Sequence, residues 1–209
     1  MKNSQTLFAG LGSAATFVVI FSLVASGRYE SADRGMFGAI NSLTSSAVVA
    51  LPAVALTGLG SGVAEGVIAA LIYLFSKPNR KLAVGIVAAI ALSDVVVFVL
   101  DSAYFRPRPY PVVANPYIQP GRDGSASFPS GHSTRAFAIG SVVSILKGRK
   151  YAVIFIVAGG IALSRVLVGV HFPLDVTGGA FLGITLGVSA LFLTDALRLV
   201  QLARRLIPI

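Results

Sequence analysis

The chain contains no cysteine, and only 12% of its 209 residues are charged. The absence of cysteine excludes disulfide bonds, thiolate metal sites and a cysteine nucleophile. The scarcity of charge excludes an ordinary soluble domain, because such domains carry about 25% charged residues. Apolar residues instead make up 55% of the chain, and the mean hydropathy is +0.83. These values also exclude disorder, collagen and coiled coil, and they predict an integral membrane protein.

Acidic residues are scarcer than basic ones, with 8 against 17 and a formal net charge of +9. In a membrane protein such an excess usually reflects topology, since positive residues are retained on the cytoplasmic side. The charge therefore need not indicate a nucleic acid, and we expect no nucleic-acid partner.

An uncharged segment, residues 3–27, follows Lys2. Residues 7–25 within it fit one bilayer crossing of about 20 residues. A cleaved signal peptide is the alternative interpretation, because a basic residue precedes an apolar run. We favour a retained anchor, since the run is long and no small-x-small cleavage site follows it.

Further apolar stretches extend to residue 194. Residues 36–56 contain a polar cluster from Asn41 to Ser46, so we interpret them as an interfacial or partly inserted helix. Together with the first crossing, the other stretches predict an all-α polytopic bundle of about six transmembrane helices, in a single membrane domain over residues 1–209. The five further spans are expected at about 57–76, 82–104, 131–146, 151–170 and 174–194.

Three basic clusters lie between or after these spans. Six crossings place all three on the same side as Lys2, which the positive-inside rule identifies as the cytoplasm. The connections 105–130 and 165–173 then face outward. A full crossing by residues 36–56 would keep the clusters together but would move Lys2 to the other side. The clusters are Lys77, Arg80 and Lys81, then Lys147, Arg149 and Lys150, and finally Arg198, Arg204 and Arg205.

The 105–130 connection holds six of the ten prolines in the sequence. Because proline fixes φ and removes a backbone donor, this connection cannot be helical and should be stiff. Connections of this length are more often functional than mere linkers.

Residues suited to phosphate chemistry lie in three short segments at the outward ends of spans. Both histidines of the chain, His132 and His171, lie within these segments. The segments are Arg106-Pro107-Arg108-Pro109, then Ser127-Phe128-Pro129-Ser130-Gly131-His132-Ser133, and then Ser164-Arg165 followed by His171 and Asp175.

The positive groups of these segments favour a phosphate site. Arg106, Arg108 and Arg165 offer planar guanidinium forks that match phosphate oxygens. Ser130 stands where a helix should begin, as a natural N-cap. Gly131 lets an anion approach the free N–H groups and the positive dipole end of that helix.

The histidines and the aspartate suit phosphoryl transfer. His171 and Asp175 are four residues apart, so at helical spacing they share a face. The carboxylate can keep one ring nitrogen protonated and leave the other as a nucleophile. Pro173 lies between them, but proline is tolerated in the first turn of a helix. His132, from another span, is suited to give and take a proton.

The three segments resemble the signature of the type 2 phosphatidic acid phosphatase superfamily, the integral-membrane lipid phosphatases. The second family motif, Pro-Ser-Gly-His, is matched at residues 129–132, and the third, Ser-Arg-x5-His-x3-Asp, at residues 164–175. In the first motif, Lys-x6-Arg-Pro, Arg108-Pro109 is present but Asp101 occupies the lysine position. The resemblance covers about residues 57–194, which we take as the catalytic core.

The resemblance implies a role for each matched residue. His171 would be the nucleophile that forms a phosphohistidine, Asp175 its orienting partner, and His132 the acid that protonates the leaving oxygen and then activates water. Such a site needs no metal or other cofactor, because arginines and amides supply the positive field. Two histidines and one aspartate could bind zinc, but three nearby arginines argue against a cation. Phosphate would be held by Arg108, Ser130, Gly131 and Arg165, with Arg106 as a further candidate and Asp101 and Ser164 as modulators.

The family acts on lipid phosphates, so the expected partners are a lipid phosphate substrate and the surrounding membrane lipid. The candidate substrates are undecaprenyl pyrophosphate, phosphatidylglycerol phosphate, phosphatidic acid and lipid A phosphates. We favour a polyprenyl or other bacterial envelope lipid, hydrolysed at the outer face of the cytoplasmic membrane, towards the periplasm or cell exterior. The alternatives are a lipid phosphotransferase with the same site, a vanadium haloperoxidase, which six spans disfavour, and a lipid transporter or scramblase without turnover. The sequence does not indicate the oligomeric state.

The carboxylate of Asp101 would repel a phosphate and cannot replace a lysine. One hypothesis is that Arg106 supplies the missing cation while Asp101 pairs with one of the arginines. The alternative is that Asp101 lies at the lipid–water boundary and caps the third span.

Three other charged residues lie within apolar stretches. For Asp94 we favour pairing with a serine, threonine or arginine in the bundle over a proton relay, since carboxylates within a membrane are costly. Glu65, beside the glycine-rich residues 58–62, is expected at a boundary near water. Arg135, one turn beyond His132, could either reach the phosphate or pair with an acid.

Overall fold

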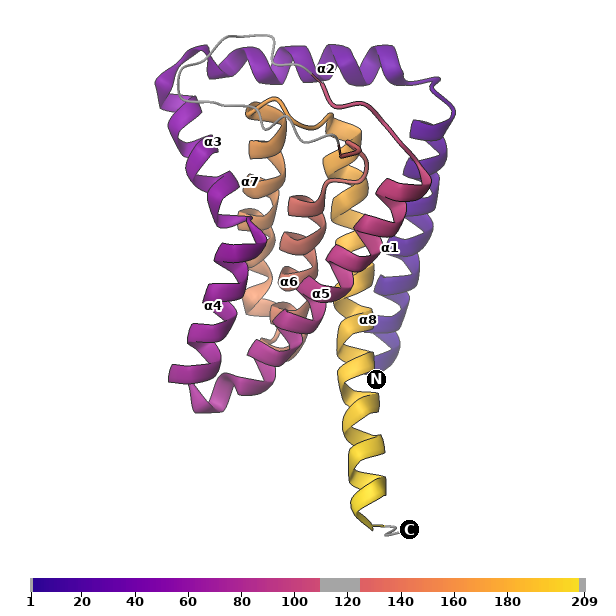
Figure 1. The fold of residues 1–209 in the computed structure, drawn as a ribbon, viewed down its shortest axis with the longest axis vertical. Helices are drawn as coiled ribbons and strands as arrows, with labels where there is room; N and C mark the ends of the chain where they lie inside the picture. Colours follow the sequence, from indigo (N-terminus) through magenta and orange to yellow (C-terminus); the bar gives the residue numbers. More distant parts are fainter. Residues whose placement is uncertain (1, 110–124, 207–209) are drawn as a thin grey trace.

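The computed structural model describes residues 2–109 and 125–206. Most helices run along the long axis of the molecule, while α2 lies across one end (Figure 1). No strand occurs among the described residues, and the prediction of an all-α membrane bundle is confirmed. The elements are α1 (Lys2–Ala25), α2 (Glu30–Ser42), η1 (Leu43–Ser45), α3 (Ala47–Leu59), α4 (Gly62–Phe75), η2 (Lys77–Asn79), α5 (Arg80–Ala103), α6 (Gly131–Lys147), η3 (Arg149–Val153), α7 (Ile154–Leu167) and α8 (Pro173–Leu206).

Within the described part of the chain, four stretches of helix are long and apolar enough to cross a membrane. A helix suits such a sequence because a backbone in lipid must satisfy its own hydrogen bonds. Each stretch overlaps one predicted span, so the first, third, fifth and sixth predicted spans are confirmed as helices. The stretches are Ser4–Ala25, Lys77–Ala103, Arg149–Leu167 and Pro173–Leu197.

The chain between α1 and α5 differs from the prediction of one interfacial helix followed by one span over 57–76. The chain bends by 110° between residues 30–45 and α3, so residues 36–56 belong to two helices rather than one. Figure 1 shows α3 running away from α2 along the bundle, with α4 continuing in the same direction. The physical reason is capping, because the hydroxyls of Ser46 and Ser61 each accept a hydrogen bond from the first turn of a new helix. The second passage through the bundle is therefore a broken one, made by α3 and α4 together.

Helix α6 is the central helix, surrounded by α5, α7 and α8. Its predicted bounds, 131–146, agree with the observed Gly131–Lys147. It falls outside the four apolar stretches because it has only 17 residues and carries polar side chains such as Ser133, Thr134 and Ser141. A helix enclosed by other helices need not be apolar on every side, so α6 can carry polar chemistry through the middle of the protein.

Close contact between α6 and α8 depends on glycines of α8. A Cβ atom on Gly183 would lie 2.3 Å from the carbonyl oxygen of Thr134, and one on Gly187 would lie 2.4 Å from that of Ala138. Both obstacles are backbone atoms, which cannot rotate away. Small residues let two helix backbones approach in this way within membranes.

We expect Gly183→Ala to lower the free energy of unfolding by about 1–3 kcal/mol, since an added methyl group overpacks this contact. Gly159→Ala on α7 is the matched control, because no heavy atom lies within 4 Å of its Cβ position. Helix propensity alone should make that control neutral or up to about 1 kcal/mol more stable. Thermal unfolding of both variants in one detergent measures the difference. Equal melting midpoints would contradict tight α6–α8 packing.

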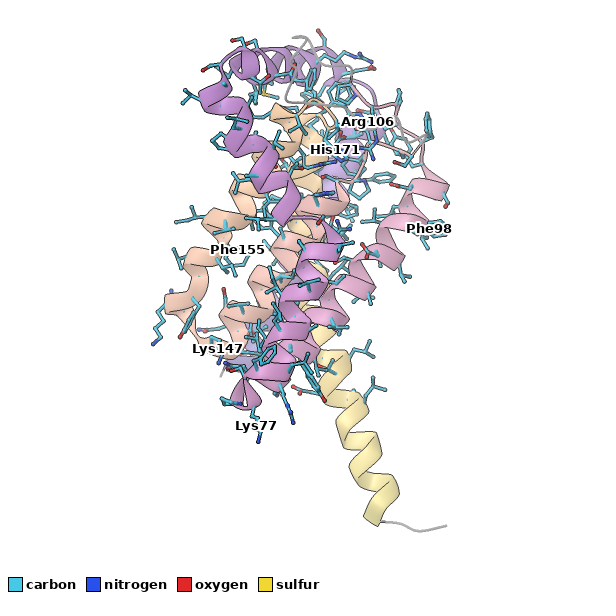
Figure 2. All side chains as sticks on the ribbon, turned by 60° about the vertical axis from the view of Figure 1, so that its left-hand side comes forward. Lys77, Phe98, Arg106, Lys147, Phe155 and His171 are labelled. Carbon is cyan, nitrogen blue, oxygen red and sulfur yellow. The ribbon has the colours of Figure 1, made fainter. Side chains whose placement is uncertain are left out.

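The two ends of the bundle differ in character. Figure 2 shows Lys77 and Lys147 at one end and Arg106 and His171 at the other. Helix α1 begins at the same end as Lys77 and Lys147, while α8 extends towards that end (Figure 1). The first two basic clusters and the start of α1 therefore lie together, opposite the segments with predicted chemistry, as six passages through the bundle require.

Candidate active site

Backbone hydrogen bonds join the three predicted segments at one end of the bundle. The N–H of Ser127 donates to the carbonyl of Arg106 at 2.7 Å, which joins the first segment to the second. The N–H of Ser130 donates to the carbonyl of Asp175 at 3.1 Å, which joins the second to the third. Segments far apart in sequence thus meet at the start of α6 and α8.

His171 lies immediately before α8 and is 2% exposed. Its Nδ1 is 2.7 Å from the carbonyl oxygen of Ser127, and its Nε2 is 3.1 Å from Nη1 of Arg108. A carbonyl can only accept and a guanidinium can only donate, so the proton belongs on Nδ1 and the lone pair on Nε2. The ring therefore presents a nucleophilic nitrogen towards a cation.

The surroundings of His171 favour its neutral form. Burial lowers the pKa of the imidazole, the charges of Arg108 and Arg165 lower it further, and Asp175 acts in the opposite direction. Because the net direction is downward from an ordinary value of about 6.5, His171 stays uncharged at neutral pH. An uncharged ring is the form that can attack phosphorus.

Asp175 is fully buried, at 0% exposed, in the first turn of α8. We expected it to hold a ring nitrogen of His171, but its Oδ2 is 3.7 Å from Nδ1, which is longer than a hydrogen bond. The carboxylate instead accepts from the N–H of Phe172 at 2.7 Å and from the hydroxyl of Ser127. Asp175 is therefore linked to His171 through Ser127, whose hydroxyl binds the carboxylate and whose carbonyl lies against Nδ1 of the ring. Sequence reasoning missed Ser127 as a site residue, although it belongs to the second segment.

Arg106 does not adopt the position that its predicted phosphate-binding role needs. Its guanidinium is buried between two carboxylates, with Nη2 2.7 Å from Oδ2 of Asp33 and Nη1 hydrogen bonded to Asp175. The same group lies over the ring of Phe172, 4.4 Å from the centroid. Two carboxylates already occupy the fork of this arginine. It therefore cannot act as the free cation that would replace the lysine of the first motif.

Asp33 is a second residue that sequence reasoning missed, and it lies outside the expected core of residues 57–194. It comes from α2, 73 residues before Arg106. No local spacing links it to the three segments. The sequence singles out Asp33 only in that it is one of 8 acidic residues in the chain.

The expected phosphate-binding residues lie around the start of α6. Ser130 occupies the N-cap position but makes no capping bond with its side chain. Its hydroxyl is buried and has no hydrogen-bond partner among the described residues. Next to it, the nearest atom to a Cβ on Gly131 would be Nη1 of Arg135 at 3.6 Å, so an anion could approach this backbone. An unused buried hydroxyl at a helix N-terminus is a natural donor to an anion.

Arg108 and Arg165 come from different parts of the chain, residue 108 after α5 and residue 165 on α7. Arg108 is fixed by hydrogen bonds from its guanidinium to the carbonyl of Val170 at 3.0 Å and to the hydroxyl of Ser125 at 2.8 Å. Arg165, on α7, donates to the hydroxyl of Thr57 on α3. Each of these contacts is with a neutral oxygen atom, and both guanidinium groups stay candidates for binding a phosphate.

His132 lies in the first turn of α6, half-buried. Gly60, at the break between α3 and α4, lies against it, since a Cβ there would be 3.3 Å from Cδ2 of the ring. Of the two predicted modulators, Ser164 donates its hydroxyl to the carbonyl of Ile161 at 2.6 Å, which is a contact within α7. Asp101 lies in the last turn of α5, and its role stays a prediction.

A second ionic cluster lies deeper in the bundle, around Arg135 on α6. Its guanidinium donates to Glu65 at 2.9 Å, to Asp94 at 2.7 Å and to the carbonyl of Gly60 at 3.2 Å. The prediction that Asp94 pairs within the bundle is confirmed, and Arg135 pairs with acids. The expectation that Glu65 lies at a boundary near water is wrong, because the residue is 5% exposed. In this cluster one guanidinium pairs with two carboxylates, of which Glu65 is buried and Asp94 is exposed.

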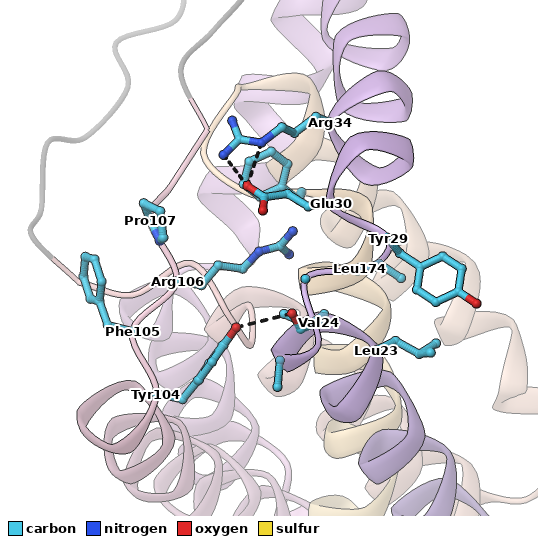
Figure 3. A pocket seen from close by; sticks show the side chains of 13 residues that line it. Leu23, Val24, Tyr29, Glu30, Arg34, Tyr104, Phe105, Arg106, Pro107 and Leu174 are labelled. Atoms are coloured by element: carbon cyan, nitrogen blue, oxygen red, sulfur yellow. Dashed lines mark hydrogen bonds and ion pairs between the residues drawn. The ribbon is translucent and has the colours of Figure 1, made fainter.

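A small cavity of about 140 Å³ lies on the α1–α2 side of Arg106. Figure 3 shows its walls, which come from the end of α1, the start of α2 and residues 104–107. The hydroxyl of Tyr104 closes one side with a hydrogen bond to the carbonyl of Val24 at 3.4 Å. His171, Arg108 and His132 are not among its lining residues, so the cavity is separate from these three predicted site residues.

Residues 82–198 match the family model described as the PAP2 superfamily. Among curated proteins, the undecaprenyl-diphosphatase BcrC of Bacillus subtilis is 30% identical over 138 residues, which cover 65% of this chain and 70% of the relative. Matches to two other curated relatives cover 55% and 56% of those proteins, so the chain spans about half of their length.

Two solved structures resemble the bundle. Aquifex aeolicus LpxE superposes with a TM-score of 0.64 at 30% identity, over 76% of this chain and 93% of that one. A PAP2-type phosphatidylglycerolphosphate phosphatase from Bacillus subtilis superposes with a TM-score of 0.72, over 90% and 97% of the two chains. At 23% identity, the second comparison supports the fold alone.

Proposed function

Because the chain belongs to the PAP2 superfamily, we propose that it is a membrane lipid phosphatase that works through a phosphohistidine at His171. The observation that carries this proposal is the setting of the His171 ring. Its Nδ1 is 2.7 Å from the carbonyl of Ser127, while its Nε2 is 3.1 Å from the guanidinium of Arg108. This arrangement keeps the lone pair on Nε2 and puts a phosphate-binding cation beside it.

In the first step, Nε2 of His171 attacks the phosphorus atom, and the bond between phosphorus and the lipid oxygen breaks. His132 donates a proton to the departing oxygen, which belongs to a lipid alcohol or, for a pyrophosphate, to a lipid monophosphate. The His171 ring gains positive charge while Nδ1–H remains hydrogen bonded to Ser127. Nearby negative charge on Asp175 stabilises that state.

In the second step, His132 takes a proton from a water molecule, and the water oxygen attacks the phosphohistidine. The phosphorus–nitrogen bond breaks, inorganic phosphate leaves, and His171 returns to its neutral form. Arg108, Arg165, the Ser130 hydroxyl and the Gly131 N–H hold the equatorial oxygens in both steps. These donors supply the positive field of the site, so no metal is required.

The substrate that we favour is a polyprenyl pyrophosphate. Support comes from the 30% identity with the relative named undecaprenyl-diphosphatase. Phosphatidylglycerol phosphate, phosphatidic acid and lipid A phosphate are the alternatives. We place the site at the outer face of the cytoplasmic membrane, because Lys77 and Lys147 lie at the opposite end of the bundle and basic residues favour the cytoplasm.

Phosphate release by the purified protein in detergent tests the proposal. The panel contains undecaprenyl pyrophosphate and the three alternative lipids, each with and without excess chelator. We expect phosphate release to be the same with and without chelator, because guanidinium and amide groups supply the positive charge that a metal ion would otherwise supply. Release that stops in chelator and returns with a divalent cation would contradict the mechanism.

The same assay separates the rival functions. A phosphorylated second lipid without free phosphate would favour a phosphotransferase. Labelled lipid that moves between leaflets without phosphate release would favour a transporter or scramblase.

A further inference from the structure

Helix α2 buries a carboxylate where it crosses the end of the bundle. Its inward face carries Asp33, Phe37 and Asn41, spaced four residues apart, while the rest of the helix is largely exposed. Asp33 is 0% exposed. Burying a carboxylate is costly unless it is paired, so a contact must hold it there.

Both contacts of Asp33 are with residues that build the candidate active site. Oδ2 accepts from Nη2 of Arg106 at 2.7 Å, and Oδ1 accepts from the N–H of Leu174 at 3.0 Å. Leu174 lies in the first turn of α8, whose N–H groups have no partner within the helix. Asp33 therefore supports the same turn that carries Asp175 and follows His171.

Arg106 connects the two carboxylates. One side of its planar fork binds Asp33, and the other binds Asp175. The ring of Phe172 supports the face of the fork at 4.4 Å. This fork holds Asp175 at one angle, from which the carboxylate also binds the Ser127 hydroxyl and the Phe172 N–H.

The charges of the three residues do not cancel. Two carboxylates and one guanidinium carry a net charge of −1. Arg106 paired with Asp175 alone would form a neutral pair, and little negative potential would remain for the histidine. Because Asp33 shares the guanidinium, negative charge remains beside the ring, where Oδ2 of Asp175 is 3.7 Å from Nδ1 of His171.

We infer that Asp33 is a positioning residue for the nucleophile, which acts by sharing Arg106 with Asp175 so that Asp175 stays oriented and negative beside His171. The inference rests on the proposed function. It assigns to α2, outside the three motif segments, a part in the first chemical step. That step places positive charge on the His171 ring and should depend on the net charge of the three residues. The second step removes that charge and should not be slowed when the negative potential falls.

Rapid-quench measurement of the phosphoenzyme tests this inference. Asp33→Asn keeps the size of the side chain and removes its charge. We expect phosphoenzyme formation to slow about tenfold through the lost Coulomb term, with hydrolysis of the phosphoenzyme and the dissociation constant of the substrate unchanged. A purely structural role would change the fraction of folded protein rather than the ratio of the two rates.

Glu30→Gln is the matched control, because Glu30 lies on the same helix and forms an exposed i,i+4 pair with Arg34. We expect both rates to be those of the unchanged protein. Arg106→Lys is a second test that does not depend on the folding of Asp33→Asn. A single ammonium group cannot bind two carboxylates as a fork does, so phosphoenzyme formation should again slow selectively.

The outcomes are distinct. No phosphoenzyme in the unchanged protein would overturn the proposed function, and this inference with it. An active unchanged protein with a normal rate of phosphoenzyme formation in folded Asp33→Asn would overturn the inference alone. If Asp33→Asn does not fold, a normal rate in Arg106→Lys would overturn it instead.

Discussion

Replacing His171 with alanine will reduce phosphate release by about 10⁴-fold or more, the range found when a covalent nucleophile is removed. The variant has no ring nitrogen to attack phosphorus, while Arg108 and Arg165 remain to bind the substrate. Phosphate release and acid-labile labelling of the protein measure the effect. We expect neither product nor phosphoenzyme, with a thermal unfolding midpoint close to that of the unchanged protein.

His132→Ala provides the comparison, since the two histidines have different tasks. With p-nitrophenyl phosphate, whose leaving group needs no proton, this variant should still form the phosphoenzyme. The intermediate should then accumulate, because no base activates water. A phosphoenzyme in His171→Ala, or its absence from folded His132→Ala, would contradict the assigned roles.

Asp175→Asn is expected to lower kcat by about 10³–10⁴-fold, as for an aspartate that orients a catalytic histidine. Three donors converge on this carboxylate, from Arg106, Ser127 and Phe172. An amide offers only one oxygen, and its NH₂ group would meet another donor. The Ser127 backbone should therefore shift, and the His171 ring should lose its fixed tautomer.

Asp195→Asn is the matched control on the same helix. Asp195 is exposed and pairs with Lys81 at 3.1 Å, far from the site in sequence and at the surface. Exposed pairs of this kind contribute about 0–1 kcal/mol, so kcat should not change. Steady-state kinetics of the two variants, with unfolding midpoints measured alongside, gives the comparison. Equal kcat values for Asp175→Asn and the unchanged protein would remove Asp175 from the mechanism.

Much of the site could be predicted because its residues are close in sequence. The Pro-Ser-Gly-His run keeps its groups within about one turn, and His171 and Asp175 of the Ser-Arg-x5-His-x3-Asp run are four residues apart. Folding of a single helix end therefore brings Ser130, Gly131 and His132 together, and another brings His171 and Asp175 together. Hydropathy likewise predicts the long spans, since lipid imposes a helix on an uncharged run of sufficient length.

The roles of Arg106 and Asp33 could not be predicted in this way. An arginine inside a phosphatase-like motif is a natural phosphate ligand by its chemistry. The role of Arg106 is assigned differently only once its ion pair with Asp33 of α2 is known. The position of α2 in turn depends on the turn at Ser46. That serine belongs to the polar cluster from Asn41 to Ser46, because of which residues 36–56 are not expected to form a full span. The sequence shows a break there, but it does not show its angle.

The ion pairs of Arg135 could not be predicted from the sequence for the same reason. Each of its three charged members lies on a different helix, and their mutual distances depend on how α4, α5 and α6 pack. The sequence indicates that Asp94 needs a partner, because a carboxylate within a membrane is costly. It cannot distinguish Arg135 from any other donor until the helices are placed.

The contact between Asp33 and Arg106 also defines the unit that can be exchanged between related proteins. The match to the family begins at residue 82, well after α2. A chimaera that joined this core to an amino-terminal segment without an acidic residue in the place of Asp33 would keep all three motif segments, yet it would leave Arg106 with one carboxylate instead of two. An exchange of the core therefore has to include α2 if both ion pairs of Arg106 are to be kept.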